Sequence, residues 1–597
     1  MKGFMRRKAC FLIAALMLVA AVAGTLGACS PSQAPDAADG AGAATTAATA
    51  AAAATEASAT EAAAQEAATP EPSASAEAPA SEPAGDAQGA QGADDPLRIG
   101  EYPKAATDVT LRYYVTLNAN VSAIAPTVNE LPFTEEEYER TGIKVVYEHP
   151  PQGQENERFN LMMASNDLPD MIVASWYNID GGPQKMINDG YIADLNTLID
   201  YAPNFKRLLD EQPDVDRMVR TEEGSLYSFP CLKLDPELRV FYGPIVRADW
   251  LRDLGIAPPE TMEEWHDMLA RFRDEKGADA PLSYTIANGA ANMNTYGLFI
   301  GAYGIKNSFY LDGDTIRHGA LEPSYRDFVT EFARWYGEGL IDPNLPAVDN
   351  KALDAQILNG NTGATTTFNG SGLGRYLQAK QDEGDTAYDL VATKAPVLAK
   401  GSTPEFGQID FPYSGNNCVA ISAQSEHKEL AAQFLDYAFS PEGNMFYNFG
   451  TEGLSYEMQG GEPIFTDLIL NNPDGLSISH ALARYTHSSY EGPYPLDIRY
   501  FKQIYLLQQQ KDAFEAWTDH NGEKHLVPRF ALTDAESEEY AVIMTDVNPY
   551  LDEMLMKFIM GVEPLENYEQ FAQELRGMKL ERAIEIQQAG YNRYLAR

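Results

Sequence analysis

The chain has 597 residues, and its 87 Asp and Glu outnumber its 44 Lys and Arg to give a formal net charge of −43 at pH 7. Nucleic acid is excluded as a partner, because binding to a phosphate backbone requires clustered basic side chains. The charge also disfavours polyanionic ligands, and otherwise serves solubility.

The first 28 residues are typical of a secretory signal. Basic residues precede an almost purely apolar run at 10–22, which is shorter than the about 20 residues that a membrane span needs. Cys29 follows Leu26-Gly27-Ala28 and resembles the lipobox cysteine of bacterial lipoproteins. That implies a diacylglycerol thioether on Cys29 and a two-chain anchor on the outer face of the cell membrane. The alternative is an ordinary secretory signal with an incidental cysteine.

Residues 30–95 contain eleven acidic side chains and no Lys or Arg, among mostly Ala, Ser, Thr, Pro, Gly and Gln. Such a segment has too little apolar surface to offset the entropy of ordering. We therefore expect residues 29–95 to be a disordered tether behind the lipidated Cys29, with a reach of roughly 45 Å.

Residues 96–597 carry a net charge of −36 and are too many for one hydrophobic core, so at least two lobes are expected. This body has only two cysteines, Cys231 and Cys418, and is not built on disulfides. The pair either forms a bridge or remains as two buried thiols.

The body begins with strands and helices in alternation. Strands are predicted at 109–115, 143–147 and 170–174, with helices at 135–141, 159–164 and 183–189. This order predicts an α/β fold with a parallel, doubly wound sheet, in which ligands bind beyond the carboxyl ends of the strands.

Further along, Thr261 and Glu264 form a capping box that opens a helix, and Thr533 and Glu536 form a second one. An Asp-Gly turn within residues 310–316 predicts a hairpin. Beyond residue 548 the chain is helix-rich.

Ten short segments match, in order, a known family of proteins. They are 141–145 (TGIKV), 168–172 (LPDMI), 190–199 (GYIADLNTLI), 224–230 (GSLYSFP), 247–255 (RADWLRDLG), the helix opened by Thr261, 337–343 (GEGLIDP), 440–456 (SPEG to GTEGLSY), 558–561 (FIMG) and 589–594 (AGYNRY). In these the chain resembles extracellular solute-binding proteins of family 1, in particular the large Gram-positive lipoproteins that serve carbohydrate ABC importers.

The resemblance implies a type II periplasmic-binding-protein fold, with two α/β lobes joined by a hinge that closes on the ligand. Lobe 1 would comprise residues 96–240 with a returning segment at 388–440, and lobe 2 residues 241–387 with the helix-rich 441–597. The implied function is capture of an extracellular solute, most simply an oligosaccharide, for a membrane permease. The protein would be a monomer without a cofactor or catalytic activity.

Relatives often carry a calcium loop after the helix that ends near residue 274. Residues 274–282 (DEKGADAPL) lack the oxygen ligands at alternate positions that calcium requires, so no metal is expected.

A sugar pocket combines aromatic platforms with a few orienting polar groups. Asn118 follows the first strand, and Trp176 and Tyr177 follow the third, where the cleft is expected. The two aromatic residues either stack on the ligand or pack beneath a loop.

Other candidates for ligand binding come from later motifs, and each has a structural alternative. Arg247 either binds ligand or pairs with an acid such as Asp249. The remaining candidates either line the cleft or serve as caps, turns and hinge elements: Phe368, Asn369, Asn417, Glu452 and Tyr456.

Two other classes of function stay open. A secreted carbohydrate-active enzyme needs only two facing carboxylates, although no hydrolase, zinc or nucleotide motif is present. A surface ligand sensor or adhesin would share the fold and lack a permease partner.

Overall fold

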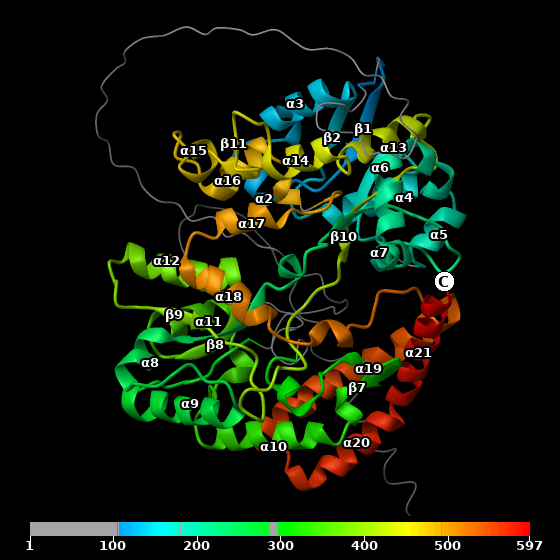
Figure 1. The fold of residues 1–597 in the computed structure, drawn as a ribbon. Helices are drawn as coiled ribbons and strands as arrows, with labels where there is room; N and C mark the ends of the chain where they lie inside the picture. The colour runs from blue at the N-terminus through cyan, green and yellow to red at the C-terminus, as the bar shows by residue number, and fades with distance from the viewer. Residues whose placement is uncertain (1–103, 106, 180, 286–296, 491) are drawn as a thin grey trace, which may run out of the picture. The chain divides into compact units, whose positions relative to one another are not determined.

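The structure is a computed structural model that describes residues 104–597 except 106, 180, 286–296 and 491 (Figure 1). The expected signal peptide, Cys29 and the tether at 29–95 lie outside the described residues. Within the described part, no helix has the length and apolar character needed to cross a membrane.

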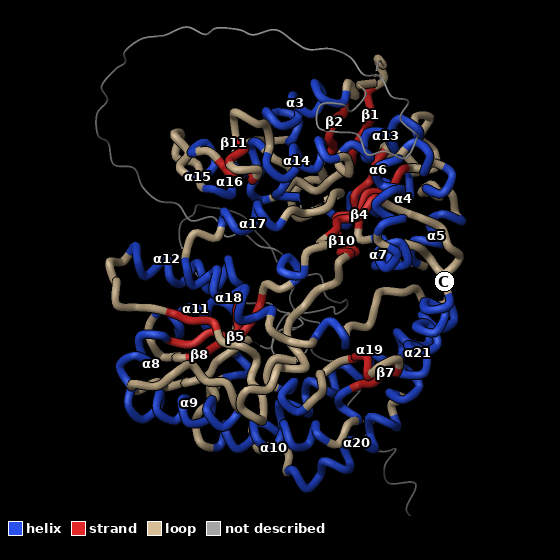
Figure 2. The backbone as a smooth tube through the Cα atoms, in the orientation of Figure 1, coloured by secondary structure: helices blue, strands red, loops and turns tan. Residues whose placement is uncertain are grey.

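The first sheet has five strands in the order β2-β1-β3-β10-β4 (Figure 2). β1 pairs in parallel with both β2 and β3, and β10 runs antiparallel between β3 and β4. The parallel strands predicted from the sequence are therefore confirmed. The strands are β1 (Thr110–Tyr114), β2 (Lys144–Glu148), β3 (Met171–Ala174), β4 (Phe229–Leu232) and β10 (Tyr413–Ile421).

Helices connect these strands as the sequence predicts. α3 ends at Gly142, whose positive φ of 69° suits a glycine, and a side chain there would collide with the carbonyl oxygen of Ala105. The helices around this sheet are α2 (Ala119–Ser122), α3 (Pro132–Thr141), α4 (Glu155–Ser165), α5 (Gly182–Asn188), α6 (Pro203–Glu211), α7 (Pro213–Met218) and α13 (Lys428–Tyr437).

The second sheet has three antiparallel strands in the order β8-β5-β9. They are β5 (Tyr242–Arg247), β8 (Ala364–Phe368) and β9 (Leu390–Ala392). The sequence predicts that the chain returns to lobe 1 near residue 388, but β9 follows that residue and still belongs to the second sheet. The return to lobe 1 therefore lies further along the chain than predicted. The strand that returns is β10, because only there does the chain pair with β3 and β4 again.

A second hydrophobic core surrounds α9 and α10, and both predicted capping boxes are present at the starts of α9 and α19. The predicted hairpin is β6 and β7. The elements of this part are α8 (Ala248–Leu254), α9 (Met262–Lys276), β6 (Phe309–Asp312), β7 (Thr315–His318), α10 (Ser324–Gly337), α11 (Asn350–Leu358), α12 (Arg375–Asp382), α18 (Gln508–Thr518), α19 (Asp534–Ile559), α20 (Tyr568–Gly577) and α21 (Leu580–Ala596).

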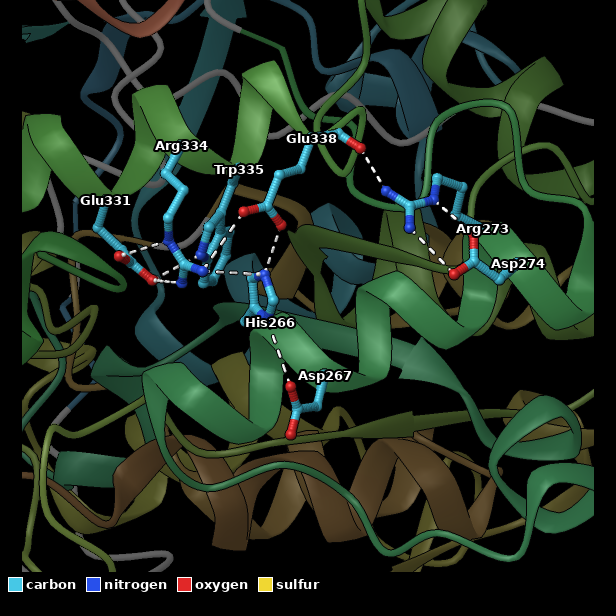
Figure 3. A network of polar contacts seen from close by, with 8 residues as sticks. All are labelled: His266, Asp267, Arg273, Asp274, Glu331, Arg334, Trp335 and Glu338. Carbon is cyan, nitrogen blue, oxygen red and sulfur yellow. Dashed lines mark hydrogen bonds and ion pairs between the residues drawn. The ribbon is translucent and has the colours of Figure 1, made fainter.

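Polar side chains join α9 to α10 above this core (Figure 3). His266 contacts Glu338 at 2.6 Å, Arg334 binds both Glu331 and Glu338, and the indole of Trp335 donates to Glu331 at 2.7 Å. Each polar group of this network therefore has a partner on the neighbouring helix or on its own. We assign it to helix packing and not to ligand binding.

Residues 441 to about 504 depart from the expected lobes. Phe446 and Tyr447 of α14 (Pro441–Phe449) and Ala483 of α16 (Ile478–Tyr485) belong to the core of the first sheet, not the second. The expectation that this segment belongs to lobe 2 is therefore wrong, because its apolar residues are buried against lobe 1. A small separate core nearby includes residues of β11 (Tyr456–Gln459), β12 (Glu462–Phe465), α15 (Asp467–Leu470) and α17 (Ile498–Ile504).

Two segments cross between the sheets and pair with each other; we call residues 233–241 and 408–412 the hinge segments. The amide of Lys233 donates to the carbonyl of Pro412 at 2.7 Å, and the amide of Asp410 donates to the carbonyl of Arg239 at 2.9 Å. The buried side chain of Gln408 accepts from the amide of Phe241 and donates to the carbonyl of Arg239. Hydrogen bonds thus hold the two crossings together.

Helix α21 also links the two parts. Its first half packs in the second core and its last turns pack in the first. Arg593 near its end binds Glu222, just after α7, and Glu536 in the first turn of α19.

Cys231 lies on β4 and Cys418 on β10, the neighbouring strands that continue from the hinge segments. Both are buried thiols in the structure, and no disulfide joins them.

Glu137 is a buried carboxylate in the first core. It is 1% exposed and accepts hydrogen bonds from the hydroxyls of Tyr147 at 2.7 Å and Tyr447 at 2.6 Å. Burial raises the pKa of Glu137 to about 7, although these hydrogen bonds favour the charged form.

Because the folded protein holds this proton more tightly than the unfolded chain, the free energy of unfolding should fall as the pH rises from about 4.5 to about 7. The contribution of Glu137 to this loss is on the order of 3 kcal/mol. Urea denaturation over this range should show the loss in the wild type, and Glu137→Gln should lack that part of it. Exposed Glu139→Gln is the control and should follow the wild type. If the free energies of unfolding of the wild type and of Glu137→Gln differed by the same amount at both ends of this pH range, the assignment would be contradicted.

Candidate functional site

Tyr177 and Asn417, predicted from separate motifs, meet at the carboxyl end of β3. β10 pairs with β3 in the register Cys418 to Ala174, so the residues just before Cys418 lie beside those just after Ala174. Asn417 is exposed, with a positive φ of 54° in the irregular part of β10. Both residues therefore lie at the sheet edge where the sequence predicts the cleft, and their role in ligand binding stays a prediction.

Tyr177 is half-buried, and both its hydroxyl and its ring contact neighbouring residues. Its hydroxyl donates to the carbonyl of Met218 at 3.4 Å, and its ring packs edge-on against Tyr227. Burial raises the pKa of Tyr177 to about 12, against the opposing effects of Tyr227 and two arginines, Arg597 and Arg529. The phenol is therefore neutral and offers a hydrogen bond and a ring edge.

Trp176 does not reach the surface. Its side chain is fully buried, its indole donates to the carbonyl of Cys418 at 3.2 Å, and its ring packs edge-on against Phe159. The expectation that Trp176 stacks on a ligand is corrected for this conformation, because the ring has no exposed face.

Asn118 lies at the same edge, after β1, but its side chain is already engaged. It caps α2 by accepting from the amide of Asn120 and donates to the carbonyl of Ser489 at 2.9 Å. The hydroxyl of Tyr490 accepts from the amide of Asn118 at 3.4 Å. Asn118 therefore positions the 488–490 turn at the edge.

Two residues that sequence reasoning missed complete this side. The guanidinium of Arg529 lies over the ring of Phe411, 5.6 Å from its centre. A β-carbon on Gly415 would fall 2.4 Å from the Arg529 Nη1 atom and 3.9 Å from the ring of Tyr177. Arg529, Phe411 and Tyr177 are thus neighbours around Gly415.

Phe368, the last residue of β8 in the second sheet, contacts the hinge segment 233–241. It is 40% exposed and stacks almost parallel on Phe241, with ring centres 5.9 Å apart. The ammonium of Lys233 lies 5.4 Å from the centre of the Phe241 ring. Lys233 is also hydrogen-bonded through its amide to Pro412, which is next to Phe411 in the chain. Phe411 and the pair of Phe241 and Phe368 therefore adjoin the same hinge segments.

Asn369 and Arg247 do not join this group. Asn369 is 1% exposed and donates to the carbonyl of Gln510 in α18. Arg247 lies at the far end of β5, about 17 Å along the strand from Tyr242, which pairs with Phe368. Its guanidinium binds both carboxylate oxygens of Asp249, so it is a structural ion pair and not a free ligand group.

Glu452 and Tyr456 lie in the small unit built around β11 and β12. Tyr456 is 5% exposed and packs on Phe449, whereas Glu452 is exposed and bridges only to Tyr456. Tyr456 belongs to a core with no hinge residue in it, and Glu452 is bridged to Tyr456, so the structure does not bring either residue to the edge of the first sheet.

Among the described residues, no group of three or more His, Cys, Asp or Glu gathers to hold a metal ion. A shallow depression of about 700 Å³ is lined by Gln570, Gln573, Glu574, Gly577 and Met578. It has no aromatic side chain and lies at one helix, so it does not suit a sugar.

The hinge site, which we define as Tyr177, Asn417, Phe411, Arg529, Phe241 and Phe368, combines four aromatic rings with an amide and a cation. Aromatic faces suit the C–H faces of a sugar ring, and the polar groups suit its hydroxyls. One signal could have revealed Arg529, because residues 525–533 contain no acid in this acid-rich chain.

Residues 122–445 match the sequence model of the family described as bacterial extracellular solute-binding protein. Lipoprotein LipO of Bacillus subtilis is 26% identical over 389 residues, which cover 63% of this chain and 73% of LipO. The fructooligosaccharide ABC transporter substrate-binding protein FusA of Streptococcus pneumoniae is 22% identical over 467 residues, which cover 74% of this chain and 83% of FusA.

Solved structures of solute-binding proteins share the fold. A human-milk-oligosaccharide (HMO) binding protein from Bifidobacterium longum infantis has a TM-score of 0.66 at 14% identity, covering 81% of this chain and 99% of that protein. FusA in complex with kestose has a TM-score of 0.61 at 21% identity, covering 82% of this chain and all of FusA. These likenesses confirm the two-lobed α/β fold of type II.

The contacts of Arg247 predict a structural role. Arg247→Ala would leave the mostly buried Asp249 carboxylate without its cation, and we expect the free energy of unfolding to drop by about 3–5 kcal/mol. Urea denaturation measures this. Arg252→Ala on the following helix, α8, is the control, because the Arg252 side chain is 59% exposed and its ion pair with Asp389 should contribute less than about 1 kcal/mol. Equal effects of the two substitutions would show that Arg247 is not a structural ion pair.

Proposed function

The chain belongs to the bacterial extracellular solute-binding protein family, and we propose that it captures an oligosaccharide at its hinge site and delivers it to an ABC permease. The observation that carries the proposal is that two aromatic groups, Tyr177 with Phe411 and Phe241 with Phe368, adjoin the same pair of hinge segments. The relatives named for fructooligosaccharide and milk-oligosaccharide binding support a glycan as the ligand.

The chemistry of the site supports a sugar over a purely apolar ligand. Phe368 offers an exposed ring face backed by Phe241, and Asn417 offers an amide that can both donate and accept hydrogen bonds. Contacts to both lobes would exist only when the hinge is closed, so the ligand would stabilise that state. Closure would then report occupancy to the permease.

The N-terminal region completes the proposal. A lipid on Cys29 and the tether at 29–95 would keep the binding domain near its permease and raise the effective concentration of the loaded protein. The relative LipO, named a lipoprotein, supports this anchor.

A glycan-binding screen tests the central claim. A saturating oligosaccharide, at 100 times its dissociation constant, should stabilise residues 96–597 by about 2.7 kcal/mol in a thermal-shift measurement. Phe368→Ala should weaken the best ligand roughly 10-fold or more in isothermal titration, because it removes an aromatic platform. Tyr201→Ala removes an equally accessible ring that lies in lobe 1, away from the hinge segments, and should leave the affinity unchanged.

Other outcomes of the same screen distinguish the alternatives. A response to peptides and to no glycan would refute the sugar ligand. Hydrolysis of a bound glycan would favour the carbohydrate-active enzyme, whereas one-to-one binding without turnover supports a binding protein.

The anchor has its own test. Cys29→Ala should release the protein into the medium and abolish its labelling by radioactive palmitate, because the thioether cannot form without the thiol. Ligand affinity should be unchanged and uptake of the ligand by cells should fall. Palmitate labelling that persists in Cys29→Ala would refute the lipid site, and a Cys29→Ser variant serves as the conservative comparison.

A further inference from the structure

Arg529 is a cation at the hinge that has no ion-pair partner among the described residues. It lies in the loop before α19 and is half-buried, over Phe411 and beside Gly415. Its guanidinium makes no hydrogen bond or ion pair with any residue that the structure describes. The contact with Phe411 compensates only part of the lost hydration of a guanidinium.

Other arginines of the chain show how unusual this is. Where the side chain is partly buried, it has carboxylate or carbonyl partners: Arg593 binds Glu222 and Glu536, and Arg247 binds Asp249. Within the described ranges, only Arg158 and Arg326 also lack hydrogen-bond or ion-pair partners for the side chain, and both are exposed. An exposed cation keeps its water, whereas a half-buried one has lost part of it.

A glycine and aromatic rings surround the guanidinium. Any side chain at residue 415 would collide with Arg529 Nη1, so glycine is required there for the observed position. Tyr177 and Phe411 flank the guanidinium with aromatic rings, and the exposed Asn417 lies two residues from Gly415. The position is therefore part of the hinge site and not an isolated surface arginine.

An arginine fork binds a carboxylate through two parallel hydrogen bonds, a geometry that a hydroxyl group cannot match. We propose that the oligosaccharide carries a carboxylate, on a hexuronic acid residue, and that Arg529 binds this group while the sugar ring lies against Phe411 or Tyr177. This inference rests on the proposed glycan-binding function. The net charge of −36 in residues 96–597 favours an isolated carboxylate over a densely sulfated or phosphorylated chain.

Matched ligands test the proposal. Glucuronic- and galacturonic-acid-containing oligosaccharides are compared by isothermal titration with the same oligosaccharides after reduction of each carboxyl group to a hydroxymethyl group. The full chain carrying Cys29→Ala should bind the best acidic form about 10- to 100-fold more tightly than its reduced form. In Arg529→Gln this preference should vanish, and Arg529→Lys should restore part of it.

Arg326→Gln is the matched control. Arg326 also lies over an aromatic ring, that of Tyr568, and has no anionic partner among the described residues, but it is far along the chain from the hinge segments. This variant should keep the full preference. Equal binding of acidic and reduced forms by the wild type, or a preference that survives in a correctly folded Arg529→Gln, overturns the inference. If neutral oligosaccharides bind and acidic forms are not preferred, only the inference of a carboxylate on the ligand is overturned. If no glycan binds, the proposed function is overturned as well.

Discussion

The backbone pairing of the two hinge segments is the constraint on which the rest of the site depends. Lys233 and Asp410 donate across the pair, and buried Gln408 ties both segments together through its amide. Because residues 233–241 continue β4 and residues 408–412 lead into β10, this pairing fixes where the edges of the two sheets meet. The aromatic groups of the hinge site adjoin the same segments for this reason, although they come from positions up to about 230 residues apart.

Much of the fold could be predicted because its signals are local. The parallel order of β1, β2 and β3, the capping boxes of α9 and α19 and the β6–β7 hairpin all follow from residues close together in the chain. The lobe boundaries were harder, because the affiliation of a segment depends on which core buries its apolar face. β9 and α14 show this: each is an ordinary element in sequence, and only its packing partner places it in the other lobe.

For the proposed site, the sequence predicts a sheet edge better than it predicts which side chains face outward there. Strand order located the edge where Tyr177 and Asn417 lie, but it could not tell which of two adjacent aromatic residues faces outward. Trp176 turns into the core because its indole has a carbonyl partner there, supplied by Cys418, some 240 residues later. Arg529 was missed because its significance is the lack of a partner in space, which the absence of acids from residues 525–533 only hints at.

The same contacts bear on how easily the hinge can move. Arg593 joins Glu222 of the first lobe to Glu536 of the second, and the three side chains are 34%, 19% and 19% exposed. Ion pairs that are partly solvated contribute only about 1 kcal/mol each, whereas reversing a two-state equilibrium from 1:99 to 99:1 takes about 5.5 kcal/mol. The difference in ligand affinity between the open and closed states must supply most of that energy. A charge that is satisfied only when ligand is bound, as Arg529 would be, increases this difference more than contacts made equally in both states, since uniform binding shifts no equilibrium.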